Sequence, residues 1–512
     1  MKHVLFVAAE NDALPNAKVG GVADVVRDLP AALADRGWDV TVMIPAYGVL
    51  HTVGGAKRVG SISARFRGEL QDVGVWEVPG SFPSVRNLVL DHPLFGADGS
   101  GQIYFADDAD RPFATDANKF ALLSAAAATF VENAENKPDV VHLHDWHAAF
   151  YCVLREYSSR YPSLPDIRTV FTIHNLSYQG VRPFKGDKSS LASWFPELDF
   201  DAPTIADPAY DDCVNPMLAA IRLADAVSTV SPTYAKEICR ASDPTTGFIG
   251  GEGLEKILQE AADAGRLHGV LNGCYYDTPP PKRDWRELLT EMRKQVAEWR
   301  KTQPDEAAHA VAAKTLKSLN ERKPSTVLLS IGRLVSQKAT LFVSATTSGR
   351  PPLIEIIDKL DKDALLIVLG SGERKYELAL RDMAAKSGKI LYLQGYAETL
   401  SESLYAVADL FLMPSSFEPC GISQLLAMRA SLPCVVHSVG GLRDTVIDGE
   451  TGFCFSGSGI AEQADAFVSA TTDAIALRKS RPGKFQRIRD AAGDQRFSWT
   501  RSATRTIECL YE

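Results

Sequence analysis

Short apolar runs alternate with amphipathic stretches along most of the chain. The runs are apolar on both faces and lack the period-two alternation of a half-exposed sheet, a pattern typical of parallel strands that helices cover on both sides. They fall into two sets: residues 4–9, 40–45, 140–144, 170–174 and 226–231, then residues 326–331, 364–369, 390–394, 410–413 and 433–436. The pattern therefore predicts an α/β protein with two doubly wound domains.

A connecting region at 271–323 separates the two sets. It contains consecutive prolines at 279–281 and a charged segment at 282–301. We expect the domain boundary in this region. Doubly wound domains bind ligands at the carboxyl ends of their strands, so a ligand is expected in a cleft between the two domains.

Composition narrows the class of protein. A chain of 512 residues with 45% apolar and 23% charged residues is long enough for two or more ordinary globular domains. The net charge of −9 argues against nucleic acid binding through bulk charge. The sequence has no run of 18 apolar residues, so we expect no membrane partner, and its eight cysteines are scattered without a CxxC pair. Scattered cysteines favour reduced thiols in the cytoplasm.

Residues 410–424 combine a predicted strand, a turn and a helix start with a carboxylate. Gly421 lies beside the helix start, where backbone N–H groups are suited to an anion. Glu418 precedes it, and a carboxylate repels phosphate. We interpret Glu418 as an acceptor for neutral hydroxyls next to the phosphate. A nucleotide-sugar, which has a sugar on one side and a phosphate on the other, satisfies both groups.

Two further stretches carry cations to predicted strand ends. Lys18 precedes Gly20 and Gly21 at the start of a helical pattern after the first strand, so a phosphate is expected to approach the backbone there. Arg333 and Lys338 follow the first strand of the second set, and one loop is expected to bring both onto a pyrophosphate. A tight turn and solvated surface charge are the simpler interpretations of each stretch taken alone.

A histidine cluster at 142–147 suggests a metal site at first sight. His142, His144, His147 and Asp145 are metal-ligand types, but a strand followed by a turn spreads them. We prefer a cleft wall, in which Trp146 packs or faces a sugar. His174 ends the next strand and is expected at the same sheet edge as Asp145.

The stretches at 18–24, 144–147, 174–175, 332–338 and 417–424 resemble, in this order, the signature stretches of bacterial glycogen synthase and plant starch synthase. The resemblance implies the GT-B fold, which has two facing Rossmann-like domains with an interdomain cleft. It implies an N-terminal domain on the acceptor side at 1–273, which carries the Lys18 loop, and a nucleotide-sugar domain at 274–492. The C-terminal helix at 493–512 is expected to cross back to the N-terminal domain.

The resemblance also implies transfer of glucose from ADP-glucose to the non-reducing 4-hydroxyl of glycogen or another α-1,4-glucan, with retention and without a cofactor or metal ion. Its implied catalytic residues are Glu418, His174 and Asp145. Tyr396 matches the aromatic residue that stacks on adenine, and Asn272 offers an amide to a ligand. Together, the expected donor-binding residues are Lys18, Gly20, Gly21, Asp24, Asn272, Arg333, Lys338, Tyr396, Cys420, Gly421, Ile422 and Ser423.

Departures from the family pattern concern the loops: Val19 stands where Thr is common, and Ala339 where Gly is usual. Two alternatives stay open. One is a GT-B glucosyltransferase that uses UDP-glucose or a small acceptor, and the other is a catalytically silent glucan-binding paralogue. The sequence does not indicate an oligomeric state.

Overall fold

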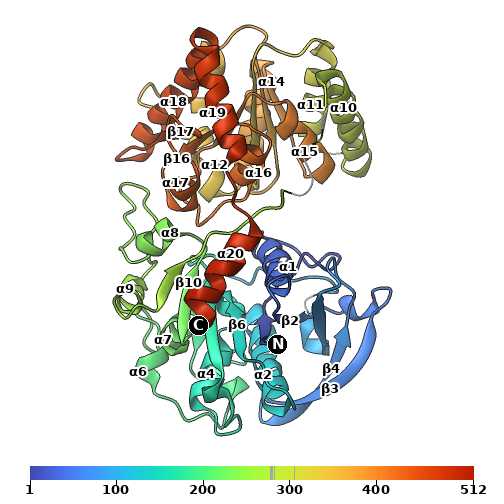
Figure 1. The fold of residues 1–512 in the computed structure, drawn as a ribbon, viewed down its shortest axis with the longest axis vertical. Coiled ribbons are helices and arrows are strands. Elements are labelled where there is room, and N and C mark those ends of the chain that lie inside the picture. The colour runs from blue at the N-terminus through green and yellow to red at the C-terminus, as the bar shows by residue number, and fades with distance from the viewer. Residues whose placement is uncertain (98, 277–280, 282, 305) are drawn as a thin grey trace. The chain divides into compact units, whose positions relative to one another are not determined.

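The computed structural model describes residues 1–97, 99–276, 281, 283–304 and 306–512, and the chain forms two compact units (Figure 1). The first unit comprises residues 1–242, 250–272 and 499–512, and the second comprises residues 243–249 and 273–498. Of the prolines at 279–281 that marked the expected boundary, positions 279 and 280 lie outside the described residues.

The first unit is built on a sheet of nine described strands in the order β11-β10-β7-β6-β1-β2-β5-β4-β3. All pairs from β11 to β5 are parallel, whereas β3, β4 and β5 pair antiparallel. The strands are β1 (His3–Val7), β2 (Asp39–Pro45), β3 (Lys57–Phe66), β4 (Glu69–Glu77), β5 (Val85–Asp91), β6 (Val140–His144), β7 (Arg168–Ile173), β10 (Ala226–Thr229) and β11 (Leu267–Gly269). The five strands predicted for this part are confirmed.

The strands β3, β4, β5 and β11 were not predicted. The residues of β3 and β4 do not form a run that is apolar on both faces. The first five residues of β3 are exposed, and buried residues appear only toward its end. Such an antiparallel ribbon at a sheet edge lacks a helix on one side, so its sequence carries no continuous apolar signal.

Helices flank the sheet of the first unit, and several site residues lie at the ends of these helices. They are α1 (Gly21–Ala34), α2 (Ala114–Asn133), α3 (Asp145–Ala148), α4 (Phe150–Tyr157), α5 (Leu191–Trp194), α6 (Ala202–Ile205), α7 (Pro216–Leu223), α8 (Pro232–Glu237), α9 (Glu255–Asp263) and α20 (Trp499–Thr506). A separate antiparallel pair of short strands, β8 (Arg182–Pro183) and β9 (Cys213–Val214), lies outside the main sheet.

The C-terminal segment belongs to the first unit although it follows the second in the sequence. Figure 1 shows α20 in red among the blue and green elements of this unit. The helix packs against α1, and a π-helical turn at Ile507–Tyr511 continues it. Tyr511 is buried against Trp38, with 5.0 Å between the ring centroids.

The second unit has an all-parallel sheet of six described strands in the order β14-β13-β12-β15-β16-β17. The strands are β12 (Val327–Ile331), β13 (Leu365–Leu369), β14 (Ile390–Leu393), β15 (Leu410–Met413), β16 (Cys434–His437) and β17 (Gly452–Phe455). The five predicted strands are confirmed. The strand β17 was not predicted; its residues Gly452 and Phe453 pair with Cys434 and Val435 of β16.

Both faces of this sheet are buried, which explains the continuous apolar runs. Along β12, Val327, Leu329 and Ile331 belong to one hydrophobic cluster, and Leu328 belongs to the cluster on the opposite face. The covering helices are α10 (Trp285–Thr302), α11 (Ala307–Ser318), α12 (Ser336–Val343), α13 (Pro352–Lys359), α14 (Arg374–Ser387), α15 (Glu398–Val407), α16 (Ser423–Arg429), α17 (Gly440–Thr445), α18 (Ile460–Ser480) and α19 (Pro482–Asp494).

Candidate functional site

The loop between β1 and α1 is held by a buried carboxylate. Glu10 Oε2 accepts hydrogen bonds from the backbone N–H groups of Val19 at 2.5 Å and Gly20 at 2.6 Å. Glu10 Oε1 accepts a further bond from the Tyr104 hydroxyl at 2.6 Å. The N–H of Gly20, which the sequence suggested for a phosphate, is thus donated to Glu10 in this structure. Helix α1 then begins at Gly21.

Lys18 lies in an ion-pair cluster on the same loop. Its Nζ is 2.7 Å from Asp24 Oδ1 and 3.0 Å from Asp12 Oδ2, and Arg27 pairs with both carboxylates. Burial by itself lowers the pKa of Lys18, but the ion pairs with Asp24 and Asp12 outweigh it and raise the pKa. Lys18 therefore stays charged at neutral pH, and Asp24 orients its ammonium group.

Asp145 holds the end of the neighbouring strand through the backbone. Its Oδ1 accepts hydrogen bonds from the N–H of His174 at 2.7 Å and from that of Asn175 at 3.4 Å. Asp145 adopts a left-handed φ of 54°, which is uncommon for a residue other than glycine. Burial raises the pKa of its carboxyl to about 7. Asp145 and His174, which were expected at the same sheet edge, are thus joined by a hydrogen bond from the His174 backbone N–H to the Asp145 carboxylate.

The histidines of this edge bind one another and hydroxyl groups. His144 Nδ1 lies 2.9 Å from His174 Nε2, and His142 contacts the hydroxyls of Thr172 and Tyr511. Burial lowers the pKa of His142 and His174 to about 3, so both rings are neutral at neutral pH. In the part of the chain that the structure describes, no group of three or more His, Cys, Asp or Glu side chains is arranged to hold a metal ion.

Trp146 is a packing residue rather than an open platform. It is 2% exposed, and its ring contacts Phe113 and Phe120 at centroid distances of 5.4 Å each. Gly180 closes over it with a φ of +71°, and a Cβ at Gly180 would lie 2.1 Å from the Trp146 ring. A glycine is therefore required at position 180, and the packing interpretation of Trp146 holds.

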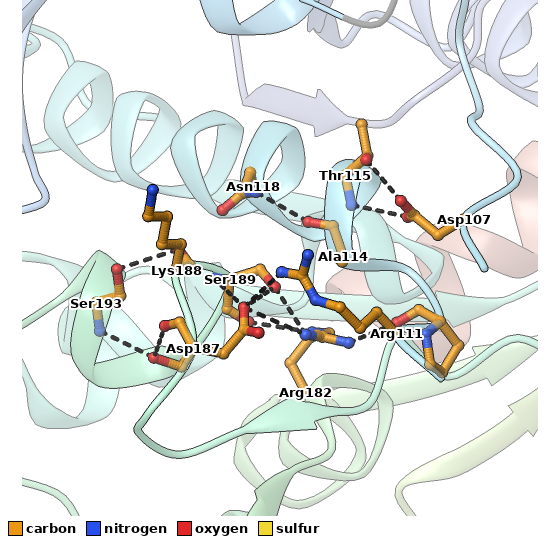
Figure 2. Close-up of polar contacts among 12 residues, drawn as sticks. Asp107, Arg111, Ala114, Thr115, Asn118, Arg182, Asp187, Lys188, Ser189 and Ser193 are labelled. Carbon is orange, nitrogen blue, oxygen red and sulfur yellow. Dashed lines mark hydrogen bonds and ion pairs between the residues drawn. The ribbon is translucent and has the colours of Figure 1, made fainter. Parts of the chain in front are cut away.

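A polar cluster connects the segment before α2 to the loop after β8. Arg182 is buried and donates hydrogen bonds to Pro112 O at 2.8 Å and to Ser189 Oγ at 2.7 Å. Asp187 accepts from Arg111 Nη2 at 3.0 Å and from Ser189 N at 2.6 Å (Figure 2). These bonds hold the segment that leads into Phe113 in place. Because Phe113 packs against Trp146, they also hold one side of the packing around Trp146.

In the second unit, Glu418 follows β15 and is 5% exposed. Its Oε2 lies 3.2 Å from Lys338 Nζ and accepts a hydrogen bond from Ser415 Oγ at 3.0 Å. The backbone carbonyl of Glu418 accepts from Gly441 N at 3.0 Å. Lys338, in the first turns of α12, thus neutralises the carboxylate beside the turn at which an anion was expected.

The turn into α16 has the geometry that its glycine requires. Gly421 adopts a φ of +80°, and a Cβ there would lie 2.3 Å from Gln424 Oε1. Gln424 donates to the carbonyls of Cys420 and Gly421 at 3.0 and 3.1 Å, which holds the turn rigid. Ile422 caps α16, and Ser423 is its first residue.

Three other predicted residues are at least partly exposed to solvent. Arg333 is exposed just after β12, and Tyr396 is 67% exposed after β14. Asn272 is half-buried and lines a cavity of about 20 Å³ in the first unit. These positions are compatible with ligand contact within each unit.

Glu10 and Tyr104 are the site residues that sequence reasoning missed. Glu10 directly follows the buried apolar run at 4–9, where an acidic residue with 2% exposure must find hydrogen-bond donors. This position of Glu10 in the sequence could have identified it as a site residue. Tyr104 had no signal, because it lies in an irregular segment far from Glu10 in the sequence.

Comparison with known families gives a match over most of the chain. The family described as starch synthase catalytic domain matches residues 3–260, and the family of group 1 glycosyl transferases matches residues 312–484. The chain belongs to the glycogen and starch synthase family of glucosyltransferases. The match confirms the resemblance that the five signature stretches carried.

Members of this glucosyltransferase family are similar over their full length. Glycogen synthase 1 of Synechocystis sp. is 34% identical, with 99% of this chain and 94% of the relative covered. Glycogen synthase of Desulfitobacterium hafniense is 31% identical, with 99% of each chain covered.

Solved structures agree with the GT-B fold. The catalytic domain of starch synthase IV from Arabidopsis thaliana, bound to ADP and acarbose, is 28% identical with a TM-score of 0.75, and 99% of this chain and 98% of that chain are covered. Sucrose-phosphate synthase from Thermosynechococcus elongatus has a TM-score of 0.56 at 16% identity, which shows a shared fold alone. In the described part of this glucosyltransferase, no helix has both the length and the apolar character that a membrane crossing needs.

Proposed function

We propose that this glucosyltransferase is a glycogen synthase that transfers glucose from ADP-glucose to the non-reducing 4-hydroxyl of an α-1,4-glucan with retention of configuration. The observation that carries the proposal is the full-length similarity to glycogen synthases of Synechocystis sp. and Desulfitobacterium hafniense. The related starch synthase IV structure, which is bound to ADP and acarbose, favours an adenine nucleotide over a uridine nucleotide.

The contacts of Glu418 support a role at the donor sugar. A buried carboxylate that Lys338 neutralises at 3.2 Å can accept hydrogen bonds from glucose hydroxyls without repelling the adjacent diphosphate. When the bond between glucose C1 and the phosphate oxygen breaks, negative charge grows on ADP. Lys338 and Arg333 in the second unit, and Lys18 in the first, are the cations that we propose to stabilise it.

Retention requires the acceptor to attack from the face that the leaving group occupies, or a covalent intermediate. We favour the first route. The glucan 4-hydroxyl oxygen bonds to C1, the C1–phosphate bond breaks, and the hydroxyl proton passes to the departing phosphate oxygen. The proposed step uses no metal ion. Asp145 supports it indirectly, because its carboxylate positions the His174 backbone at 2.7 Å.

A transfer assay tests the donor and the acceptor together. Purified protein is incubated with glycogen and isotope-labelled ADP-glucose or UDP-glucose, and the polymer product is digested with an exo-acting α-1,4-specific amylase. We expect label in glycogen from ADP-glucose, released by the amylase. Transfer from UDP-glucose alone, transfer only to a small acceptor, or glycogen binding without turnover would each contradict the proposal.

Substitution of Lys18 or Glu418 by alanine tests the site. We expect each variant to lose about 10²–10³-fold in kcat, the range seen when one preorganised charge-stabilising group is removed. Glu450→Ala is the matched control, because Glu450 is an exposed glutamate of the second unit. Circular dichroism and thermal unfolding confirm that each variant is folded. Near-wild-type kcat in both variants would refute the assignment.

A further inference from the structure

Helix α2 carries a buried ion pair that the proposed reaction does not use. Lys119 Nζ lies 2.8 Å from Asp116 Oδ1 on the same face of the helix, and the two residues are 1% and 3% exposed. A charge that is removed from water requires an oppositely charged partner and further hydrogen bonds. Both charges of this pair also bind the backbone of the segment at 103–105, which forms no helix or strand of its own.

The ion pair holds the peptide groups on both sides of Tyr104. Lys119 Nζ donates to Ile103 O at 2.8 Å. Asp116 accepts from Phe105 N at 3.1 Å and 3.2 Å through its two carboxylate oxygens. Ile103 O belongs to the peptide group before Tyr104, and Phe105 N belongs to the peptide group after it. Because peptide groups are planar, these bonds orient both planes that meet at the Cα of Tyr104.

The same helix anchors the segment again a few residues further along. Thr115, in the first turn of α2, donates to Asp107 through its backbone N–H at 2.8 Å and through its hydroxyl at 2.7 Å (Figure 2). Phe105 and Ala106, which follow Tyr104, are exposed. Hydrogen bonds to α2, rather than burial of side chains, therefore hold this part of the segment in place.

The side chain of Tyr104 connects this segment to the loop that carries Lys18. Its hydroxyl donates to Glu10 Oε1 at 2.6 Å. The other oxygen of Glu10 accepts from the backbone N–H groups of Val19 and Gly20, which follow Lys18 directly. A continuous series of hydrogen bonds therefore runs from the ion pair on α2 to the Lys18 loop.

We propose that this ion pair positions Tyr104 and thereby the Lys18 loop. A buried ion pair adds little net stability over apolar side chains of similar volume, but its charges accept only particular partners. Such a pair is suited to fixing one backbone position. Asp116 and Lys119 are thus positioning residues that act through Tyr104 and Glu10. Their effect on donor binding rests on the proposed role of Lys18, whereas their effect on the shape of the loop does not.

Hydrogen exchange of the loop at 18–20, followed by mass spectrometry, tests the positioning without any substrate. Asp116→Asn keeps the shape of the side chain but turns an NH2 group toward one of its two donors, Phe105 N–H or Lys119. We expect the loop amides to exchange about tenfold faster than in the wild type, the effect of weakening a hydrogen bond to a charged group. Tyr104→Phe, which removes the hydroxyl directly, should have the same effect. If Asp116→Asn does not fold, Lys119→Met takes its place.

Thr129→Val is the matched control for these exchange measurements. Thr129 is a buried polar residue of the same helix, but its hydroxyl contacts the Tyr161 hydroxyl instead of the segment before α2. We expect the loop to exchange as in the wild type in this variant. Unchanged exchange in Tyr104→Phe would overturn the proposal, because the series of hydrogen bonds passes through that hydroxyl. Equal acceleration in Thr129→Val would overturn it too, since any loosening of α2 would then suffice.

Steady-state kinetics separates the positioning from the proposed donor site. We expect Asp116→Asn and Tyr104→Phe each to raise KM for the nucleotide sugar about threefold to tenfold, with KM for glycogen unchanged. Because both residues act along one path, the double variant should show no more than the larger single effect. Effects that multiply in the double variant would contradict transmission through Tyr104. Faster loop exchange with unchanged KM would support the positioning and refute the donor role of Lys18.

Discussion

At the scale of single residues, the contacts of Glu10 show how a carboxylate can organise a loop that carries a cation. One oxygen of Glu10 binds two successive backbone N–H groups, and the other binds a tyrosine hydroxyl. A charged acceptor of this kind makes stronger hydrogen bonds than a neutral one. The loop therefore keeps its shape without help from a ligand, and Lys18 is held at its end.

Glu10→Ala should raise KM for the nucleotide sugar, because the Lys18 loop loses its anchor. We expect about a tenfold rise, which corresponds to the loss of one or two hydrogen bonds to a charged group. Glu10→Gln should recover most of the affinity, since its amide oxygen can accept from both N–H groups and its amide nitrogen can donate to Tyr104. Steady-state kinetics with the nucleotide sugar and glycogen varied separately measure both effects. An equal rise in KM for glycogen would indicate a general loss of structure instead.

The buried histidines predict a dependence of stability on pH. Burial lowers the pKa of His142, His147 and His174 to about 3 and that of His144 well below its usual value, and burial raises the pKa of Asp145 to about 7. Stability from the neutral histidines is present above about pH 6.5, the unfolded pKa, and is lost as the pH falls toward 3. The contribution of Asp145 to stability changes with pH in the opposite direction, because it is lost as the pH rises through 7.

On unfolding below about pH 6.5, the four histidines take up more protons than Asp145 releases. The first unit should therefore lose stability as the pH falls below about 6.5. About three protons net are taken up on unfolding, which gives up to about 4 kcal/mol per pH unit. Urea unfolding at a series of pH values measures the slope. Asp145→Asn should make the loss steeper, since it removes a group that binds its proton in the folded state. Unfolding midpoints that do not change between about pH 7 and pH 5 would contradict this prediction.

At the scale of elements, the segment before α2 and the loop after β8 depend on one buried cation. Arg182 is 4% exposed, whereas Arg111, which contacts the same Asp187, is largely exposed (Figure 2). Burial lowers the pKa of Arg182, which records the cost of removing a guanidinium from water. The hydrogen bonds to backbone carbonyls and to Ser189 offset this cost.

Arg182→Ala should destabilise the first unit by about 2–4 kcal/mol, because two backbone carbonyls and the Ser189 hydroxyl lose their donor, and each unsatisfied buried acceptor costs about 1–3 kcal/mol. Arg111→Ala is the matched control at the same aspartate and should cost about 0–1 kcal/mol. Thermal unfolding and limited proteolysis of the 107–118 and 182–193 segments compare the two variants. Similar losses in both would show that the buried position of Arg182 has no special importance.

At the scale of the whole molecule, the chain completes its first unit with its last residues. The unit contains residues 499–512 in addition to 1–242 and 250–272. Trp499, Leu510 and Tyr511 are buried in it, and the Tyr511 hydroxyl lies 2.7 Å from His142 Nδ1. The first unit therefore cannot reach its final packing before residues 499–512 have been synthesised.

A chain that ends at Ser498 should retain a folded second unit and a destabilised first unit. Removal of several large buried side chains costs about 3–5 kcal/mol each for aromatic residues, which is comparable with the whole stability of a domain. Differential scanning calorimetry should show one transition shifted strongly downward. A chain that lacks only the exposed Glu512 is the control and should behave as the full chain. An unshifted first-unit transition in the shorter chain would contradict the prediction.

The sequence by itself determined the class of fold, ten of the strands in the two sheets and the family. These features depend on local composition, since a strand buried on both faces must be apolar throughout and motif residues keep their order along the chain. The tertiary structure alone decided the contacts that give the site residues their properties. Glu10 meets Tyr104, Lys338 meets Glu418, and the ring of His144 meets that of His174. These partners lie far apart in the sequence, and each could pair with many other groups. Only the packing of strands and helices brings a particular donor within 3.2 Å of a particular acceptor and removes the water that would otherwise compete.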